Sequence, residues 1–412
     1  MGSREDVWQI IPIKYIADCN TEVLPEATDK NMPLKYIDIR SVNYGDGIRS
    51  IQKFTFAEAP SRARRVVHVG DTIISTVRTY LKAIAYISEE YRETICSTGF
   101  AVLTPHDVDA KFFFYALNSD EFVSTVEKNS YGVSYPAITE KVLIGLKLKL
   151  PPIGLQRRIA GYLDTKIAHI GNCISQLQSQ LSMLTRYKCD LIAKCITKGL
   201  DKSAPMKPSG EDWIGDVPEH WNITKLKWMF EIVKRIYGKE DRDVLAITQH
   251  GIKRKDMESN KGQYAESYGT YQVVNVNDFA MNSMDLLTGW VDCSRYEGVT
   301  SPDYRVFRFY EDKPQCHGYF TYLFQMCYTN RIFYRLGQGV SNLGRWRLQT
   351  DQFRNIKLPQ PPVEEQERIA AYLDEKIRQI DAAVADITSQ IQKLKDYRRI
   401  LIHDAVTGKI KI

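Results

Sequence analysis

The 412-residue sequence has little that would place the chain in a membrane or in an oxidising compartment. It contains no apolar run long enough to span a bilayer and no basic-then-apolar leader. Its eight cysteines form no C-x-x-C pair, and its seven histidines do not have the spacing of zinc ligands. We therefore expect a cytoplasmic protein with reduced thiols, no bound metal and no membrane partner.

The usual signatures of catalysis are also missing. No G-x-x-x-x-G-K-[ST] loop occurs, and no glycine-rich turn follows a predicted strand as a nucleotide or adenosyl cofactor would require. The Asn/Asp-Pro-Pro-aromatic tetrad of DNA amino-methyltransferases is absent, and no serine lies in a nucleophile motif. These absences predict a protein that recognises a partner and is not itself an enzyme.

The sequence does contain an internal repeat. The segment RIAGYLDTKI (158–167) returns as RIAAYLDEKI (368–377), and 151–200 aligns on 361–410 with about 19 identities in 50 positions. Weaker matches precede each copy, such as GVS at 132–134 and again at 339–341. We predict globular domains over 1–150 and 221–360, helices over 151–197 and 361–412, and a linker rich in Pro, Gly and Ser over 198–220.

The repeated segments have the apolar spacing of a coiled coil. Apolar residues recur in alternating steps of four and three for almost five heptads. A helix of roughly 40 residues, about 60 Å long at ~1.5 Å per residue, is too long to fold back on its own globule. We expect the two helices to pair antiparallel within one chain; the alternatives are packing on the helix's own globule and an intermolecular bundle. The predicted seam consists of Leu163, Ile167, Ile170, Ile174, Leu177, Leu181, Leu184, Lys188, Leu191 and Cys195, and of Leu373, Ile377, Ile380, Val384, Ile387, Ile391, Leu394, Arg398, Leu401 and Ala405.

Both globular domains have the sequence patterns of strands as well as of helices. Strands are predicted over 71–77, 81–88 and 100–105 in the first copy and over 271–281, 289–294 and 304–310 in the second. A helix is predicted over 111–127, with its counterpart over 318–328. The expected fold class is mixed α/β: two globular domains separated by two long antiparallel coiled-coil helices, with an internal pseudo-two-fold repeat.

The two copies differ most in two loops, one after a shared strand and one after the shared GVS. The exchanged residues are types that hydrogen-bond base edges, pair with phosphate or stack on bases. This pattern is expected if both copies keep the same fold and use different loops to bind different ligands. The alternative is that these residues form an ordinary solvated surface. The net charge of +6 permits a nucleic-acid partner without arguing for one. The candidate DNA-binding residues are Arg62, Arg64, Arg65, Arg78, Thr79, Tyr80, Lys82, Ser134 and Tyr135 in the first copy, and Lys253, Arg254, Thr288, Trp290, Asn342, Arg345 and Arg347 in the second.

Other repeated residues flank the seam of the coiled coil. A surface repeated about a pseudo-two-fold axis suits two copies of one partner. The alternative is ordinary helix surface with tyrosines that cap the coil. The candidate partner-binding residues are Arg158, Tyr162 and Lys166, and their equivalents Arg368, Tyr372 and Lys376.

Several of these segments resemble one family. LPPIGLQRRIAGYLDTKI (150–167), PPVEEQERIAAYLDEKI (361–377), DWIGDVPEHW (212–221), GDTIISTVRTYLKAIA (70–85) and MDLLTGWVDCSRYEGVTSPDYRVFR (284–308) are similar to the specificity subunit of type I restriction–modification enzymes. The similarity covers nearly the whole chain and includes the repeat itself. The similarity does not identify the base-contacting residues of this chain, because the loops that contact bases differ between family members.

The resemblance implies two target-recognition domains that each recognise half of an asymmetric bipartite sequence in double-stranded DNA. It implies two methyltransferase subunits that carry S-adenosylmethionine and methylate adenine N6, and, where present, restriction subunits that use ATP and Mg²⁺. This chain would bind no cofactor itself. Two other functions stay open from sequence: a stand-alone duplicated DNA-binding regulator, and a coiled-coil scaffold for proteins.

Overall fold

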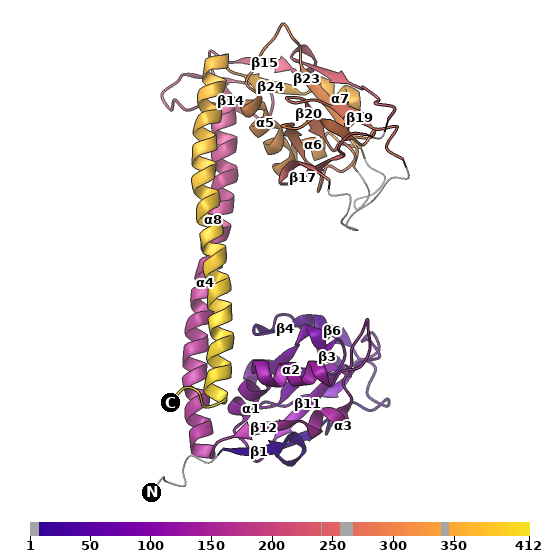
Figure 1. Ribbon diagram of the computed structural model, residues 1–412, viewed down its shortest axis with the longest axis vertical. Helices are drawn as coiled ribbons and strands as arrows, with labels where there is room; N and C mark the ends of the chain where they lie inside the picture. The colour runs from indigo at the N-terminus through magenta and orange to yellow at the C-terminus, as the bar shows by residue number, and fades with distance from the viewer. Residues whose placement is uncertain (1–7, 240, 256–266, 339–345) are drawn as a thin grey trace. The chain divides into compact units, whose positions relative to one another are not determined.

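The computed structural model describes residues 8–239, 241–255, 267–338 and 346–412. The chain divides into two compact units, Met1–Ser179 with Ile387–Ile412, and Gln180–Asp386. Each unit contains one globular domain and a part of each long helix, α4 (Ile153–Lys198) and α8 (Val363–Val406) (Figure 1).

The first domain is built on two four-stranded sheets, ordered β6-β3-β10-β7 and β2-β11-β8-β9. Its strands are β1 (Gln9–Pro12), β2 (Ala17–Cys19), β3 (Pro33–Ile37), β4 (Val42–Asn43), β5 (Gly47–Ile48), β6 (Gln52–Thr55), β7 (Ala63–Val66), β8 (Thr72–Ser75), β9 (Ile84–Tyr86), β10 (Thr94–Ser97), β11 (Phe100–Pro105) and β12 (Lys147–Leu150). Its short helices are η2 (Ile13–Tyr15), η3 (Ile39–Ser41), η4 (Thr79–Leu81), η5 (Glu89–Tyr91), α1 (Ala110–Leu117), α2 (Asp120–Lys128) and α3 (Glu140–Gly145).

The sheet β2-β11-β8-β9 lies between two apolar cores, which explains the consecutive buried apolar residues of β8, β9 and β11. Ile73 and Phe100 belong to the core that the two sheets share. Their neighbours Ile74 and Ala101 belong to a second core with α1 and α4. Successive side chains of a strand point to opposite faces, so a strand buried on both faces has no polar alternation.

The single helix predicted over 111–127 is wrong, because the structure has two helices there. Helix α1 ends at Leu117, and Ser119 is the N-cap of α2, where its Oγ accepts a hydrogen bond from the Phe122 amide at 3.3 Å. Serine competes for backbone donors in this way and favours a helix start over a helix interior.

The second domain repeats one of the two four-stranded sheets of the first, while its other strands form two-stranded pairs, β17-β18 and β19-β22. Sheet β16-β23-β20-β21 corresponds to β2-β11-β8-β9, and the pair β15-β24 corresponds to β1-β12. Its strands are β15 (Asn222–Lys225), β16 (Phe230–Val233), β17 (Leu245–Thr248), β18 (Gly251–Arg254), β19 (Gln272–Val274), β20 (Phe279–Met281), β21 (Val291–Cys293), β22 (Gly298–Thr300), β23 (Arg305–Phe309) and β24 (Lys357–Gln360). Its helices are η6 (Leu226–Trp228), α5 (His317–Thr329), α6 (Ile332–Arg335) and α7 (Thr350–Asn355).

The segment expected to be a linker, 198–220, is more ordered than its composition indicated. Strands β13 (Met206–Pro208) and β14 (Asp216–Pro218) form an antiparallel pair there. Ile214 and Val217 are buried in the apolar core of the second domain. The two apolar side chains hold the segment in place although proline and glycine surround them.

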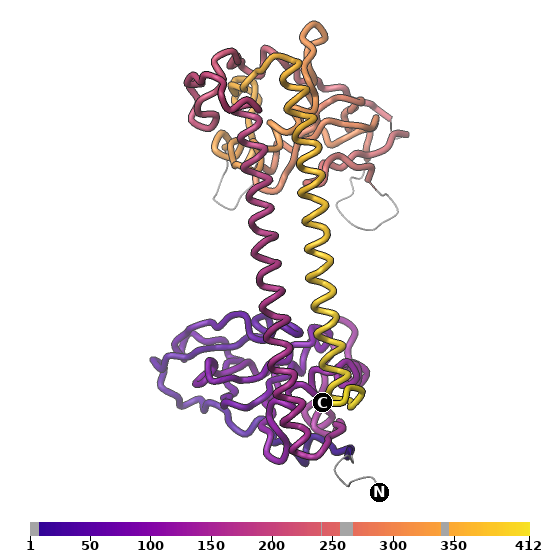
Figure 2. The backbone as a smooth tube through the Cα atoms, turned by 90° about the vertical axis from the view of Figure 1, so that its left-hand side faces the viewer, coloured from indigo at the N-terminus to yellow at the C-terminus, as the bar shows by residue number. Residues whose placement is uncertain are grey.

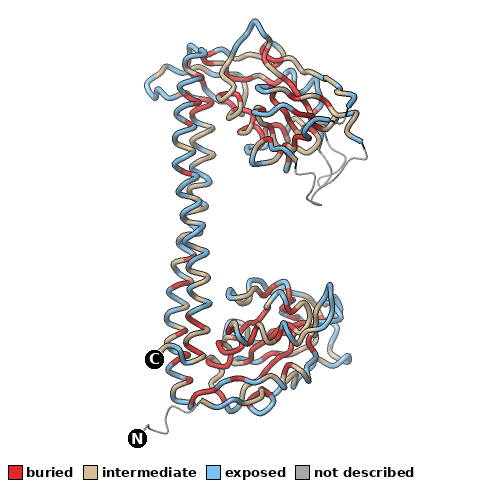
Figure 3. Tube along the Cα trace, viewed as in Figure 1, coloured by how far each residue is buried: buried red, intermediate tan, exposed pale blue. Residues whose placement is uncertain are grey.

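The two long helices lie side by side and antiparallel (Figure 2): the first unit contains the start of α4 and the end of α8, and the second unit the reverse. All twenty predicted seam residues are buried or half-buried, whereas exposed residues dominate the remaining faces (Figure 3). The predicted coiled-coil pairing and the mixed α/β fold class are confirmed. The start of α4 also packs on its own domain, since Ile159 and Leu163 share a core with Phe112.

A repeated glutamine attaches each long helix to its domain. Gln156 accepts a hydrogen bond from the Asp109 amide at 2.9 Å and donates at 2.8 Å to the backbone carbonyl five residues before it. Gln366 accepts from the Cys316 amide at 3.0 Å and makes the same 2.8 Å bond back along its chain. Both glutamines are buried, so their identity in the two copies has a structural cause.

A tyrosine–aspartate pair makes a second attachment in each copy. The Tyr115 hydroxyl donates to Asp164 at 2.5 Å, and the Tyr322 hydroxyl donates to Asp374 at 2.6 Å. Burial, together with the neighbouring carboxylate, raises the pKa of both phenols well above the usual tyrosine value. Both hydroxyls therefore stay protonated and remain donors at neutral pH.

Candidate nucleic-acid interface

The two variable loops of the first domain, far apart in sequence, meet in the structure. The amide of Thr79 donates to the Pro136 carbonyl at 3.3 Å, and its hydroxyl donates to the Ser130 hydroxyl at 2.9 Å. Thr79 is itself buried, so it joins the loops instead of facing a ligand. The loops carrying Arg78 and Tyr135 thereby form one surface.

Arg78 and Lys82 flank η4 in an unusual backbone conformation. Both have positive φ angles, 53° and 51°, in the left-handed region. Such a conformation costs a non-glycine residue roughly 1–3 kcal/mol and concentrates at functional sites. Between them, Tyr80 is half exposed to solvent. This strained turn carries four of the residues that the sequence singled out, namely Arg78, Thr79, Tyr80 and Lys82.

A short hairpin forms the other half of this surface. Tyr131 and Ala137 exchange two backbone hydrogen bonds of 2.9 Å, which close the loop that contains Ser134 and Tyr135. The Arg78 guanidinium lies 4.9 Å from the centre of the Tyr135 ring, a cation–π contact. Arg78 is thus held against the hairpin, with Tyr80, Ser134 and Tyr135 exposed around it.

Sequence reasoning missed two residues of this hairpin, Tyr131 at its base and Val133 in its loop. Tyr131 is 77% exposed and Val133 is 104% exposed, so neither has a core to pack against. The GVS repeat could have indicated Val133, because an apolar residue that both copies of the repeat keep in a loop is unusual.

The basic triplet before the first loop does not act as one cluster. Arg62 is exposed. Arg64 stacks over the Phe56 ring at 4.4 Å and donates to the Ala63 carbonyl at 2.9 Å. Arg65 is half-buried, and its Nη1 has no hydrogen-bond partner in the described part of the chain. Only Arg62 presents its charge openly to solvent.

Lys82 is engaged with protein groups. Its Nζ lies 3.4 Å from a Glu127 carboxylate oxygen and 5.7 Å from the centre of the Tyr44 ring. These contacts tie the end of η4 to α2 and to the β4–β5 turn. The geometry favours a role in holding the loop over a direct contact with a ligand.

In the second domain, β18 carries two exposed basic residues. Lys253 is exposed, and the Arg254 Nε lies 3.1 Å from an exposed Asp243 carboxylate. An exposed ion pair of this kind contributes about 0–1 kcal/mol, so Arg254 can exchange its partner for another anion at little cost.

Thr288 and Trp290 have different surroundings. Thr288 is exposed, and its hydroxyl donates to the Asp285 carboxylate. Trp290 is half-buried, packs against two apolar cores and lies 6.1 Å from the Tyr328 ring. Most of the Trp290 ring therefore serves packing, and of these two residues Thr288 is the accessible one.

Arg347 is exposed at the edge of the last loop. It forms a two-way backbone bridge with Gln338, with both hydrogen bonds 3.0 Å long. Asn342 and Arg345 lie outside the described residues.

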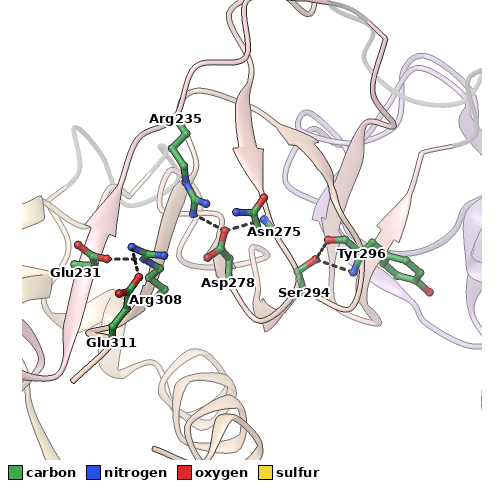
Figure 4. Close-up of polar contacts among 8 residues, drawn as sticks. All are labelled: Glu231, Arg235, Asn275, Asp278, Ser294, Tyr296, Arg308 and Glu311. Atoms are coloured by element: carbon green, nitrogen blue, oxygen red, sulfur yellow. Dashed lines mark hydrogen bonds and ion pairs between the residues drawn. The ribbon is translucent and has the colours of Figure 1, made fainter. Parts of the chain in front are cut away.

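Two other arginines of the second domain are already paired (Figure 4). Arg235 lies 2.5 Å from Asp278, and Arg308 lies 2.5 Å from Glu231. Burial raises the pKa of Asp278, and hydrogen bonds from the Asn275 amide and from Arg235 oppose the rise. Arg235 thus neutralises a buried carboxylate, and Arg308 neutralises a half-exposed one, so both cations already have protein partners.

Asp278 has an equivalent in the first domain. Asp71 is also buried, and its carboxylate accepts a 2.7 Å hydrogen bond from the amide of His68, three residues before it. Asp278 accepts the matching bond from Asn275 at 2.8 Å. The repeated aspartate therefore shapes the turn before the shared strand in both domains.

The candidate partner-binding residues lie on the helices as predicted from their spacing. Lys166 and Lys376 have their Nζ atoms 5.8 and 6.0 Å from the rings of Tyr162 and Tyr372. This matching contact gives the two copies similar local surfaces, one in each unit. Arg158 and Arg368 are exposed, and Arg158 donates to the backbone oxygen of Ile412.

Within the described ranges, no group of three His, Cys, Asp or Glu side chains is arranged to hold a metal ion. Among the same residues, no helix is both long and apolar enough to cross a membrane.

Comparison with known proteins places the chain in a family. The model for the type I restriction modification DNA specificity domain matches residues 5–181 and, a second time, 218–393. The chain belongs to this family. The two matches follow the internal repeat, and they identify the chain as a DNA specificity subunit of a type I restriction–modification system, a non-catalytic member of such an enzyme.

Individual relatives agree with the family assignment. The MjaVIII specificity subunit of Methanocaldococcus jannaschii is 22% identical over 322 residues, which cover 74% of this chain and 71% of the relative. The MjaX specificity subunit of the same organism is 23% identical over 433 residues, with 100% and 96% coverage. A chain from a structural study of complex assembly and conformational transition of the type I R-M system superposes with a TM-score of 0.71. That chain is 20% identical, with 98% of each chain covered, and it supports the fold alone.

Proposed function

We propose that this specificity subunit recognises an asymmetric, bipartite DNA target, with one part bound by each domain. The observation that carries the proposal is a repeated scaffold with two different loop sets. One four-stranded sheet and one strand pair have the same order in both domains, whereas the loop after the shared strand changes from Arg78–Lys82 to 285–290. Equal scaffolds with unequal loops are suited to two different half-sites.

The long helices would set the distance between the half-sites. Helix α4 has 46 residues, and α8 has 44. At ~1.5 Å per residue, each is about 65–70 Å long. A stiff spacer of fixed length gives a fixed gap in the target, as dimer geometry does for paired half-sites elsewhere.

The subunit would direct chemistry that its partners perform. The repeated surfaces around Tyr162 and Tyr372 suit two methyltransferase subunits, one for each copy of the repeat. Those subunits would supply S-adenosylmethionine and methylate adenine N6. Restriction subunits, where present, would bind and use ATP and Mg²⁺.

Methylation mapping tests the whole proposal. The chain is co-expressed with a methyltransferase subunit of a type I system, and N6-methyladenine is mapped across the host genome. We expect methylation at one bipartite motif with two unequal parts and a constant gap. Methylation at a single continuous or symmetric motif, or none above the level seen without this chain, would contradict the proposal.

Replacing Arg78 separates base contact from phosphate contact. We expect Arg78→Ala to cost ~1–3 kcal/mol in binding by the assembled complex and to relax one position of one half-site. Arg62→Ala is the matched control, for which we expect weaker binding to all sequences and a salt slope lower by about one. Binding titrations at several salt concentrations, with half-site variants, measure both effects. Equal losses on every sequence for Arg78→Ala would assign Arg78 to the phosphate backbone.

A further inference from the structure

Lys188 and Arg398 occupy the same position of the repeat and are the charged residues of the two seams, but they have different partners. Lys188 of α4 pairs with Asp381 of α8, with its Nζ 2.6 Å from one carboxylate oxygen. Arg398, its equivalent, lies 3.1 Å from Asp46 in the turn between β4 and β5 of the first domain. The same position thus joins helix to helix in one unit and helix to domain in the other.

The contact between Arg398 and Asp46 is close and partly desolvated. The Arg398 side chain is only 11% exposed. Gly45 permits the approach, since a Cβ atom there would lie 2.7 Å from the Arg398 Nη2, and its φ of 77° also favours glycine. Burial alone would raise the pKa of Asp46, but hydrogen bonds from Arg398 and Arg49 outweigh it and leave the pKa below its usual value. The carboxylate is thus stabilised in its charged form.

A second contact continues from α8 into the first domain. The Arg399 Nε lies 3.4 Å from the Asp120 carboxylate at the start of α2. The other Asp120 oxygen accepts from the Tyr44 hydroxyl at 3.3 Å, and the Tyr44 ring lies 5.7 Å from the Lys82 Nζ. Lys82 ends the strained turn η4. A continuous chain of polar contacts therefore links α8 to the loop that carries Arg78.

We propose that Arg398 and Arg399 are positioning residues for DNA recognition by the first domain. They hold the β4–β5 turn and the start of α2 against α8, and through Tyr44 and Lys82 they fix η4. The proposal rests on the proposed function in that η4 is taken as part of the DNA-binding surface. The proposal predicts a difference between the half-sites: recognition by the first domain depends on the contact of Arg398 and Arg399, and recognition by the second domain does not.

Charge reversal tests the contact in the full complex with methyltransferase subunits. For Arg398→Asp we expect about tenfold faster amide hydrogen exchange at Leu81 and Lys82, whose amides bond to the Arg78 and Thr79 carbonyls at 2.9 Å. We also expect degenerate methylation at one half-site only. The double variant Asp46→Arg/Arg398→Asp restores the ion pair and should recover most of both properties.

Lys188→Ala is the matched control, because it removes the equivalent cation without touching the network. It should leave exchange at 78–82 and the first half-site unchanged. Unchanged exchange in Arg398→Asp, or equal loss of both half-sites, would overturn the positioning role. A complex that never methylates a bipartite motif would refute the proposed function instead, while the exchange result still decides whether α8 holds the loop.

Discussion

Removal of one heptad from each long helix is expected to shorten the gap in the methylated motif by about three base pairs, with both half-sites unchanged. Seven residues at ~1.5 Å remove about 10 Å, and each base pair spans ~3.4 Å. Seven residues are close to two full helical turns, so the seam keeps its register. Three base pairs also rotate the DNA by about 100°, so methylation at the new gap should be slower than at the original target.

The deletion can be matched in the two copies of the repeat. Residues 177–183 of α4 and 387–393 of α8 are equivalent, and both segments lie in the seam. Genome-wide mapping of N6-methyladenine measures the gap directly. Deletion from α4 alone is the control, which misaligns the seam and should abolish methylation. The original gap in the matched double deletion would show that helix length does not set the spacing.

The second large effect is expected for Phe230→Ala, which should destabilise the second domain by ~3–5 kcal/mol. Phe230 is almost fully buried at the centre of an aromatic cluster. Its ring lies 4.4–5.7 Å from those of Phe279, Phe307, Phe309, Phe320 and Phe324. Loss of the ring leaves a cavity among five rigid neighbours that have little freedom to close it.

Calorimetry with residue-level hydrogen exchange measures this effect. We expect the second domain to unfold at a lower temperature, while the sheets of the first domain keep their protection. Phe230→Leu retains much of the volume and should cost less than half as much. A uniform loss of protection in both domains would mean that the two units do not fold independently.

The long helices and the repeat could be predicted because their signals are local and periodic. A stripe of apolar residues with steps of three and four determines which face is buried, whatever the rest of the chain does. The two-helix break at Ser119 was missed because an aromatic stripe continues across it, and only a capping hydrogen bond ends the first helix. Segment 198–220 was expected to be a linker because it is rich in Pro, Gly and Ser. Its order could not be predicted, because two buried side chains among many polar ones leave no periodic signal.

The candidate site was predictable in outline but not in its internal contacts. Divergence between the copies selected the loops of Arg78 and Tyr135, and the structure brings those loops together. The same divergence selected Thr79, Lys82 and Trp290, whose side chains face protein groups. The partners of these residues lie many positions away in the chain, so neither composition nor spacing could reveal the contacts.

The glutamine attachment has a consequence for how such a protein acquires new specificities. Gln156 and Gln366 each accept from a backbone amide, and the residues that donate, Asp109 and Cys316, have unrelated side chains. These two bonds therefore impose no side-chain requirement at positions 109 and 316, and the tyrosine that pairs with Asp164 or Asp374 is the side chain that each domain must supply. A recombination event that keeps this tyrosine could exchange an entire domain as a cassette, and the incoming sequence would be fastened to the same helix by the same two contacts.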